Sequence, residues 1–178
     1  FDKNKIQSFI SGNNYLCEDV PACTEELPGF NYEYDSNGYP FYQPQNCVIC
    51  DPGFRGILQI PDNITIREGG NCFFKSDLDA IQDIINTNDK LSNLEPLDVG
   101  HQTWIGGRIT TLAINNVNLQ SLPKSIGDLT SLQILHLDNN ELTSLPKSIG
   151  NLNNLTELAL DENQITILPN SIGNLTNL

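Results

Sequence analysis

Three copies of one pattern decide the fold: residues 112–134 (LAINNVNLQSLPKSIGDLTSLQI), 135–157 (LHLDNNELTSLPKSIGNLNNLTE) and 158–178 (LALDENQITILPNSIGNLTNL). Leu112, Leu135 and Leu158 open the copies, and the interval is 23 residues each time (135 − 112 = 158 − 135 = 23). Leucine or isoleucine returns in the same columns, as does a Pro-x-Ser-Ile-Gly run. A fixed period of this length indicates stacked coils that share one core.

Each copy also predicts its own local structure. In Leu135-His136-Leu137, the alternation of a strand turns both leucines inward and the histidine outward. Asn140 and Asn163, which follow their strands, are expected to turn inward and to hydrogen-bond the backbone of neighbouring coils. The proline and the Ser-Ile-Gly run then start a short segment on the convex side that returns the chain to the next strand.

The residues before the repeats predict a helical cap over residues 76–108. Ser76 is expected to cap the helix N-terminus and to form a capping box with Asp79. Leu78, Ile81, Ile84 and Ile85 then fall on one helix face. Further along, Trp104 is expected to pack on the first coil rather than to hold a ligand.

The pattern Leu-x-x-Leu-Pro-x-Ser-Ile-Gly-x-Leu-x-x-Leu resembles the leucine-rich-repeat proteins of bacteria and protists and the intracellular ones of plants. The preceding stretch resembles an N-terminal cap of plant or protist type. The residues that carry the second resemblance are Asp77, Ala80, Trp104 and the run Gly107-Arg108-Ile109-Thr110. Such caps usually carry a cysteine pair near the tryptophan, whereas this sequence has none there and its nearest upstream cysteine is Cys72.

The resemblance implies an α/β solenoid, a horseshoe with parallel strands on its concave face. We expect a helical cap before it, and an irregular N-terminal region stapled by disulfides before the cap. The corresponding divisions are residues 1–75, 76–108 and 109–178, with about three repeats and an incomplete C-terminal end. The family implies recognition of a protein on the concave face, and it names no ligand.

All five cysteines lie in the first 72 residues, and they predict a disulfide framework. The candidates are Cys17, Cys23, Cys47, Cys50 and Cys72. A zinc site built on Cys47-x-x-Cys50 is the alternative, although the other cysteines lack a matching spacing. One cysteine is left over, either free or bonded to another chain. A disulfide framework places the chain outside the cell or on its surface. In the same region, Asn37-Gly38 between Tyr34 and Tyr39 predicts a hairpin.

The composition limits the classes of function. A formal net charge of −13 argues against a nucleic-acid partner, and no apolar stretch is long enough to cross a bilayer. The sequence holds neither a Ser-His-Asp set, nor a phosphate loop, nor a zincin motif. We therefore expect a binding protein without catalytic residues, metal or cofactor.

Acidic residues gather on the expected concave face, near a histidine. They suggest a site for a basic protein or for calcium, whereas an ordinary solvated strand face is the commoner meaning of such charges. Calcium needs about six to eight oxygen ligands, and the ladder lacks a loop to supply them. The candidate partner-binding residues are His136, Asp138, Glu141, Glu157, Asp161 and Glu162.

Three Asn-x-Thr triplets, at Asn63, Asn154 and Asn174, are candidate glycosylation sites, of which we favour Asn63. Taken together, the sequence predicts an extracellular binding or adhesion module that recognises a partner through the concave face. The alternative is a structural subunit of an extracellular filament or surface assembly built by end-to-end contacts. An enzyme with a repeat domain as substrate reader ranks last.

Overall fold

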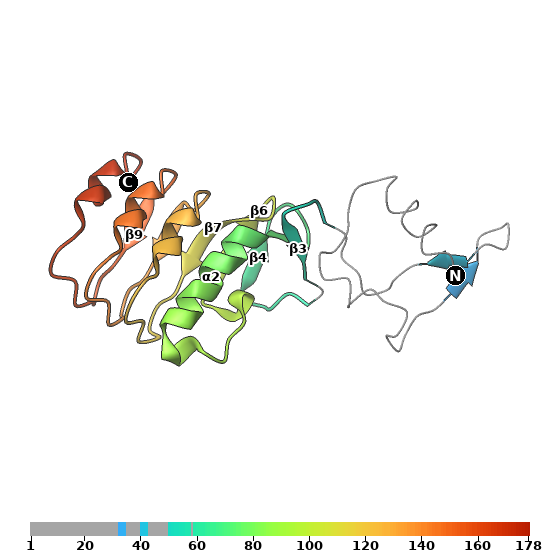
Figure 1. Cartoon of the computed structure of the whole chain (residues 1–178), viewed down its shortest axis with the longest axis horizontal. Helices are drawn as coiled ribbons and strands as arrows, with labels where there is room; N and C mark the ends of the chain where they lie inside the picture. Colours follow the sequence, from blue (N-terminus) through green and yellow to red (C-terminus); the bar gives the residue numbers. More distant parts are fainter. Residues whose placement is uncertain (1–31, 35–39, 43–49, 58) are drawn as a thin grey trace.

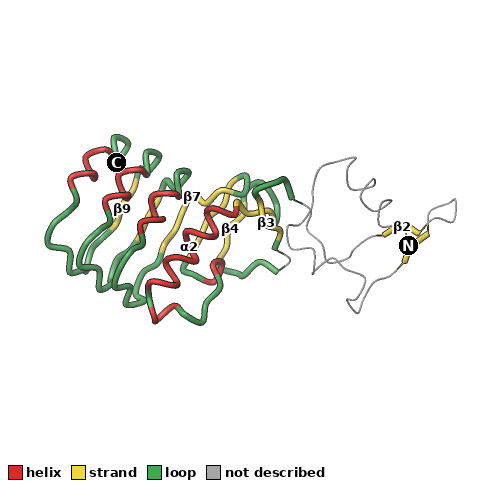
Figure 2. Tube along the Cα trace, in the orientation of Figure 1, coloured by secondary structure: helices red, strands yellow, loops and turns green. Residues whose placement is uncertain are grey.

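The computed structural model describes residues 32–34, 40–42, 50–57 and 59–178 (Figure 1). Within the described residues, strands, the helix α2 and short 3-10 helices follow one another (Figure 2). The elements are β1 (Tyr32–Tyr34), β2 (Pro40–Tyr42), β3 (Phe54–Gly56), β4 (Ile64–Ile66), β5 (Cys72–Phe74), α2 (Lys75–Thr87), η2 (Asp89–Leu91), η3 (Pro96–Asp98), β6 (His101–Ile105), β7 (Arg108–Ala113), η4 (Lys124–Asp128), β8 (Ile134–His136), η5 (Lys147–Asn151), β9 (Glu157–Ala159) and η6 (Asn170–Asn174).

A five-stranded sheet in the order β4-β6-β7-β8-β9 organises the described chain. Strands β7, β8 and β9 are parallel, and Leu112 pairs with Leu135, which pairs with Leu158. The pairing follows from the 23-residue period, because each coil places its residues beside the equivalent residues of the next coil in the sheet. The parallel strands of the repeats are those that the sequence predicts. Strand β6 runs antiparallel to β7 and parallel to β4.

The repeat leucines form the core between the strands and the 3-10 helices. Leu112, Leu135 and Leu137 are fully buried, as is Ile149 of η5. Each of these side chains packs against its counterparts in neighbouring coils, so burial depends on stacking rather than on any single coil. In the last described coil the same columns are only half-buried.

The predicted asparagine ladder is present. The Asn140 Nδ2 donates to the carbonyls of Ile114 at 2.7 Å and Leu137 at 2.9 Å, and its Oδ1 accepts from the backbone N–H of Leu119 at 2.9 Å. Asn163 repeats the arrangement one coil on, accepting from Leu142 N–H. These bonds satisfy buried backbone groups where the chain leaves the strand.

The first coil has Val117 in that column, and an asparagine outside the repeats binds other backbone groups of this coil. Asn88, at the end of α2, is 3% exposed. Its Oδ1 accepts from the backbone N–H groups of Gln120 and Ser121, and its Nδ2 donates to the Ser121 carbonyl at 3.0 Å. The helix end is therefore joined to the first coil by hydrogen bonds as well as by apolar packing.

The expected capping box at Ser76 and Asp79 is wrong. The helix begins at Lys75, so its N-cap is Phe74, two residues before Ser76, and Phe74 makes no side-chain cap bond. Asp77 explains the difference, because its fully buried carboxylate leaves the helix and binds β7. It accepts from the Arg108 Nε at 2.8 Å and from the Ile109 backbone N–H at 3.0 Å.

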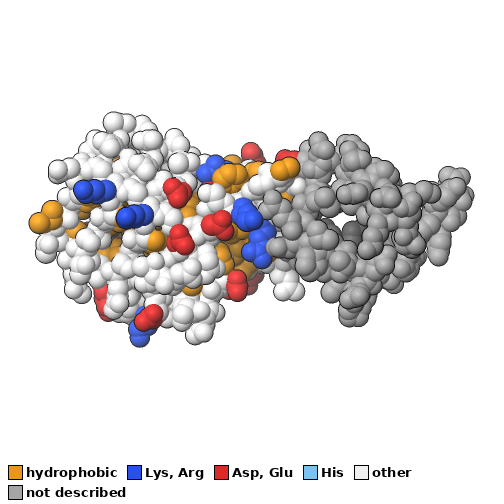
Figure 3. Space-filling model, in the orientation of Figure 1, with side chains coloured by type: hydrophobic (Ala, Val, Ile, Leu, Met, Phe, Trp, Pro, Cys, Tyr) orange, Lys and Arg blue, Asp and Glu red, His pale blue; other side chains and the backbone are white. Residues whose placement is uncertain are grey.

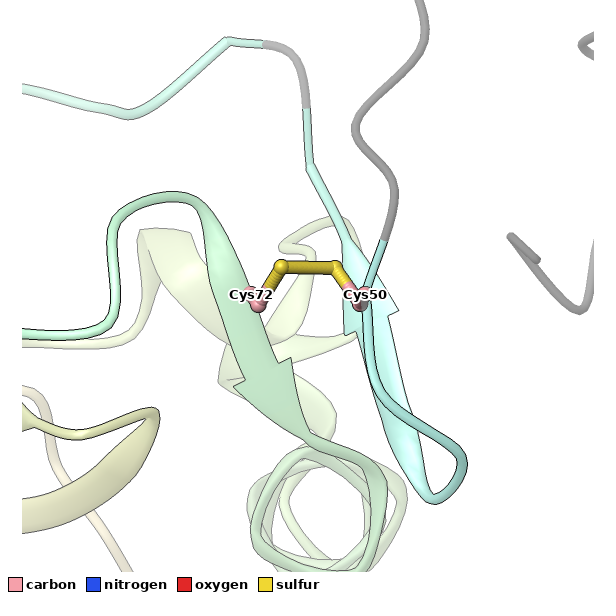
Figure 4. The surroundings of a disulfide bond; sticks show 2 residues. All are labelled: Cys50 and Cys72. Carbon is pink, nitrogen blue, oxygen red and sulfur yellow. A yellow bond between two sulfur atoms is a disulfide. The ribbon is translucent and has the colours of Figure 1, made fainter. Parts of the chain in front are cut away.

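A disulfide joins Cys50, which precedes β3, to Cys72 in β5 (Figure 4). Because both sulfurs are in this bond, the alternative of a zinc site that uses Cys50 is wrong. Cys72 is followed by the buried Phe73, whose ring packs edge-on against Trp104 at 4.8 Å between centroids. Trp104 thus has the packing role that the sequence predicts.

Residues before the expected division at residue 75 pack with the repeats. Strand β4 pairs with β6 and Phe73 joins the repeat core, so contacts cross this division.

Strands β1 and β2 pair antiparallel, with Tyr34 opposite Pro40, as a hairpin requires. The predicted Asn37-Gly38 turn, together with Cys17, Cys23 and Cys47, lies outside the described residues.

Candidate functional site: the exposed face of the repeat strands

Strands β6 to β9 have one buried and one exposed side, and the exposed side carries the predicted site. Gln102, Leu112 and Leu135 are fully buried, so the residues next to them in each strand point outward. We call this exposed side, with the loop residues that follow the strands, the strand face. Its three rows across the sheet are His101–Ala113–His136–Ala159, Thr103–Thr111–Ile134–Glu157 and Asn115–Asp138–Asp161.

The predicted residues His136 and Glu157 meet on this face. The His136 Nε2 lies 2.8 Å from the Glu157 Oε1, across the junction of β8 and β9. Both side chains are accessible, with 30% and 57% of their surfaces exposed. The pair is a hydrogen bond when the imidazole is neutral and an ion pair when it is protonated.

Asp138 has a structural role that the sequence pattern alone does not predict. Its Oδ1 accepts from the backbone N–H of Asp161 at 2.9 Å, and its own N–H donates to the Asn115 Oδ1 at 3.0 Å. Each acceptor side chain therefore binds the amide of the next coil. The signal was present in the sequence, because this column holds an Asn or Asp in all three copies.

Glu141 is also bound to a neighbouring coil. Its carboxylate accepts from the Asn118 Nδ2 at 2.8 Å and the Gln120 Nε2 at 3.2 Å. The Asn118 bond and then the Gln120 bond lower the pKa of Glu141. Desolvation opposes them to a smaller extent, and the charge of Lys90 adds the smallest lowering effect. A lowered pKa means that these bonds stabilise the fold above the unfolded-state pKa, and that this contribution disappears as the pH falls through the folded-state value.

Asp161 and Glu162 are two further accessible carboxylates of the site. Both are exposed, and no hydrogen bond or ion pair joins either carboxylate to another described residue. Glu162 has a positive φ of 52°, a conformation that Asn116 and Asn139 adopt in the equivalent positions. Asparagine tolerates this region, whereas glutamate is strained there.

The candidate glycosylation sites differ in their surroundings. The Asn63 Nδ2 donates to the carbonyls of Leu97 at 2.9 Å and Gly100 at 2.6 Å, so a glycan on this nitrogen would remove one of the two bonds. The Asn154 Nδ2 donates to the Thr130 carbonyl at 2.7 Å, and Asn174 is exposed. The preference for Asn63 thus has no support in its surroundings, and use of all three sites stays a prediction.

Within residues 50–57 and 59–178 and the two short N-terminal strands, no group of three or more His, Cys, Asp or Glu is arranged to hold a metal ion. None of the helices that the structure describes is long and apolar enough to span a membrane.

Comparison with known proteins identifies the repeats. A family model described as a leucine-rich repeat region matches residues 108–178. Residues 108–178 are leucine-rich repeats. Among solved structures, a leucine-rich-repeat protein of Leptospira interrogans is 52% identical over 39% of this chain, with a TM-score of 0.38. The match covers 18% of that protein's chain, so the present chain spans under a fifth of it. No curated protein matches the chain.

Leucine-rich repeats are typically protein-binding modules without enzymatic activity, so the matched region suggests a module for protein interaction. Of the six predicted site residues, the structure brings His136 and Glu157 into contact and places Asp161 and Glu162 in solvent. It uses Asp138 and Glu141 in bonds between coils. The resemblance of the cap to plant or protist caps stays a prediction.

Proposed function

We propose that the chain binds a cationic protein through the strand face of its leucine-rich repeats, outside the cell or on its surface. The observation that carries this proposal is the charge of the face. Its three rows hold Asp138, Glu157 and Asp161 but no lysine or arginine, and Glu162 extends the acidic surface into the adjoining loop. The side of the molecule that carries α2 shows charges of both signs instead (Figure 3).

The accessible carboxylates set the kind of partner. Glu157, at the start of β9, and Asp161 and Glu162, in the loop after it, present negative charge toward solvent, whereas Asp138 and Glu141 already accept hydrogen bonds. Lysine and arginine side chains complement such a surface, and complementary charge raises the rate of association and the selectivity of binding. The net charge of −13 reinforces this preference at longer range.

The Cys50–Cys72 disulfide supports a location outside the cytosol, because disulfides persist in oxidising compartments. The disulfide lies beside Phe73 and the cap rather than in a separate segment. An oxidising environment would therefore stabilise the part of the chain that presents the strand face. Adhesion at a cell surface is one role that fits this location.

Reversing one accessible charge tests the proposal. Asp161→Lys changes the strand face, and Asp128→Lys makes the same change of charge at an exposed position in η4. The measured quantity is the affinity of each variant for an oligolysine peptide, by calorimetry at low ionic strength. We expect Asp161→Lys to weaken binding about fivefold more than Asp128→Lys. Equal effects of the two variants would contradict the proposed site.

End-to-end assembly, the alternative that the sequence suggests, stays a prediction. Electron microscopy of the native protein with and without reductant tests this idea. Filaments would support assembly, and single particles under both conditions would contradict it.

A further inference from the structure

Strand β3 is paired with β5 alone within the described residues. The two strands form a two-stranded sheet that is separate from the five-stranded one, and three residue pairs make up their ladder. One further bond at each end extends it. The Ile57 N–H donates to the Asn71 carbonyl at 3.0 Å, and the Lys75 N–H donates to the Gly53 carbonyl at 2.9 Å. A two-stranded ribbon of this size is marginally stable in water by itself.

The ring of Phe54 in β3 covers the place where β5, the start of α2 and β7 meet. It packs edge-on against the Phe74 ring at 5.3 Å between centroids. A Cβ on Gly107 would lie 2.6 Å from a carbon of the Phe54 ring, so this ring lies directly on the Gly107 backbone. The Arg108 guanidinium, which binds the buried Asp77, stacks over Phe74 at 4.2 Å.

This covering layer is distinct from the repeat core. Among the described residues, the core contains Phe73 and Trp104 but neither Phe54 nor Phe74. The leucines of the repeats pack on one another and on Trp104. Removal of β3 would therefore uncover Phe74 and one edge of β5 and leave the repeat core in place.

The Cys50–Cys72 disulfide supplies the covalent link between the two strands. It ties the residues just before β3 to β5, with a sequence separation of 22 residues (Figure 4). A bond of this kind limits the freedom of the chain that it encloses. The marginal ladder therefore depends on the disulfide to keep β3 in place.

The two sulfurs differ in accessibility, because Cys50 is 2% exposed and Cys72 is half-buried. A thiolate of a dithiol reductant attacks the Cys72 sulfur, and Cys50 leaves as a thiolate that takes up a proton. The second thiolate of the reductant then attacks its own sulfur in the mixed disulfide and releases Cys72, which is protonated in turn. Two electrons pass from the dithiol, which becomes a cyclic disulfide, to the cystine, which becomes two thiols.

We propose that β3 is a redox-controlled strap. It is closed over Phe74 and Gly107 while the Cys50–Cys72 bond is intact, and it is released when a dithiol reduces this bond. The strap is independent of the proposed recognition of a cationic protein, because it involves no residue of the strand face. In an oxidising compartment the strap stays closed, and in a reducing one the Phe74 ring and the edge of β5 become accessible.

Hydrogen–deuterium exchange of the full chain tests the strap in three samples. These are the oxidised natural sequence, the same protein reduced by dithiothreitol, and the double variant Cys50→Ser, Cys72→Ser. The variant lacks this one bond and keeps the other three cysteines, so it separates this bond from any other that the reductant breaks. We expect exchange about tenfold faster in residues 54–57 and 73–75 of the second and third samples. Exchange in residues 112–114 and 135–137 should change much less.

Trp104 reports on the core in the same samples, because it is the single tryptophan of the chain and is fully buried. Its fluorescence emission should stay at the position of the oxidised protein. Equally faster exchange in the repeats, together with a shift of this emission, would overturn the proposal, since the bond would then support the whole fold.

Three further results would also overturn the strap. The first is unchanged exchange in residues 54–57 of both the reduced protein and the double variant. The second is release of β3 by the reductant but not in the double variant, which would assign the effect to another disulfide. The third is a Cys50–Cys72 bond that survives dithiothreitol, as measured by the mass of the alkylated protein.

Discussion

At the scale of single residues, Glu162 has an unfavourable backbone conformation on the strand face. Its φ is 52°, and the equivalent residues Asn116 and Asn139 show that asparagine suits this position. We expect Glu162→Asn to raise the free energy of unfolding by about 0.5–1 kcal/mol. Denaturant titration measures this change.

Glu162→Gln is the matched control for that variant, because it removes the same charge and leaves the backbone strain in place. It should leave stability nearly unchanged. Both variants should weaken oligolysine binding equally if the carboxylate contacts the partner. An equal gain of stability in both would show that charge repulsion, and not the backbone, destabilises this position.

The glycines of the Ser-Ile-Gly runs give a second test at this scale. A Cβ on Gly150 would lie 2.4 Å from the Ser171 carbonyl oxygen, whereas a Cβ on Gly173 would meet nothing within 4 Å. We expect Gly150→Ala to cost about 1–3 kcal/mol because the coils must separate to admit it, and Gly173→Ala to cost much less. Thermal unfolding of the two variants measures the difference, and equal losses would contradict the close stacking.

The sequence predicts the role of a repeated residue only where a single physical requirement explains the residue type at that position of the repeat. The inward turn of Asn140 follows from the need to satisfy backbone groups at the strand end, and the sequence predicts it. The use of Asp138 as an acceptor for the next coil is missed, because a carboxylate after a strand is most simply explained by solvation. Glu141 is missed for the same reason.

At the scale of elements, the ion pair between Asp77 and Arg108 joins α2 to β7. The carboxylate is fully buried, accepts from the Ile109 backbone N–H, and faces an Arg108 group that stacks over the Phe74 ring at 4.2 Å. Removing one partner of a buried pair leaves the other uncompensated. We expect Asp77→Ala to destabilise the fold by about 3 kcal/mol.

Asp79→Ala is the control for Asp77→Ala, since Asp79 is exposed in the same helix. Its expected cost is within about 0.5 kcal/mol, as for most surface changes. Urea unfolding of both variants provides the comparison. A small loss for Asp77→Ala, similar to that of Asp79→Ala, would show that the pair does not hold the helix to the sheet.

The elements differ in how far local sequence determined them. Strands β7 to β9 and the apolar face of α2 follow from periodicity. The start of α2 does not, because the capping preference of Ser76 is weaker than the requirement to bring Asp77 to Arg108. The pairing of β4 with β6 joins residues 64–66 to 102–104, and no local pattern specifies so distant a contact.

At the scale of the whole molecule, the strand face and the return segments η4 to η6 differ in chemistry. Carboxylates gather beyond the strands, whereas Lys124 and Lys147 begin the return segments η4 and η5. The sequence predicts this division, because the period assigns each column to one side. It does not predict which carboxylates remain available to a partner, since this depends on bonds between coils.

Hydrogen–deuterium exchange of the chain with and without oligolysine tests the central claim most directly. Binding at the strand face predicts slower exchange in residues 134–141 and 157–164, with unchanged exchange in the return segments at 124–128 and 147–151. Slower exchange confined to the return segments, or to residues before the repeats, would contradict recognition through the strand face.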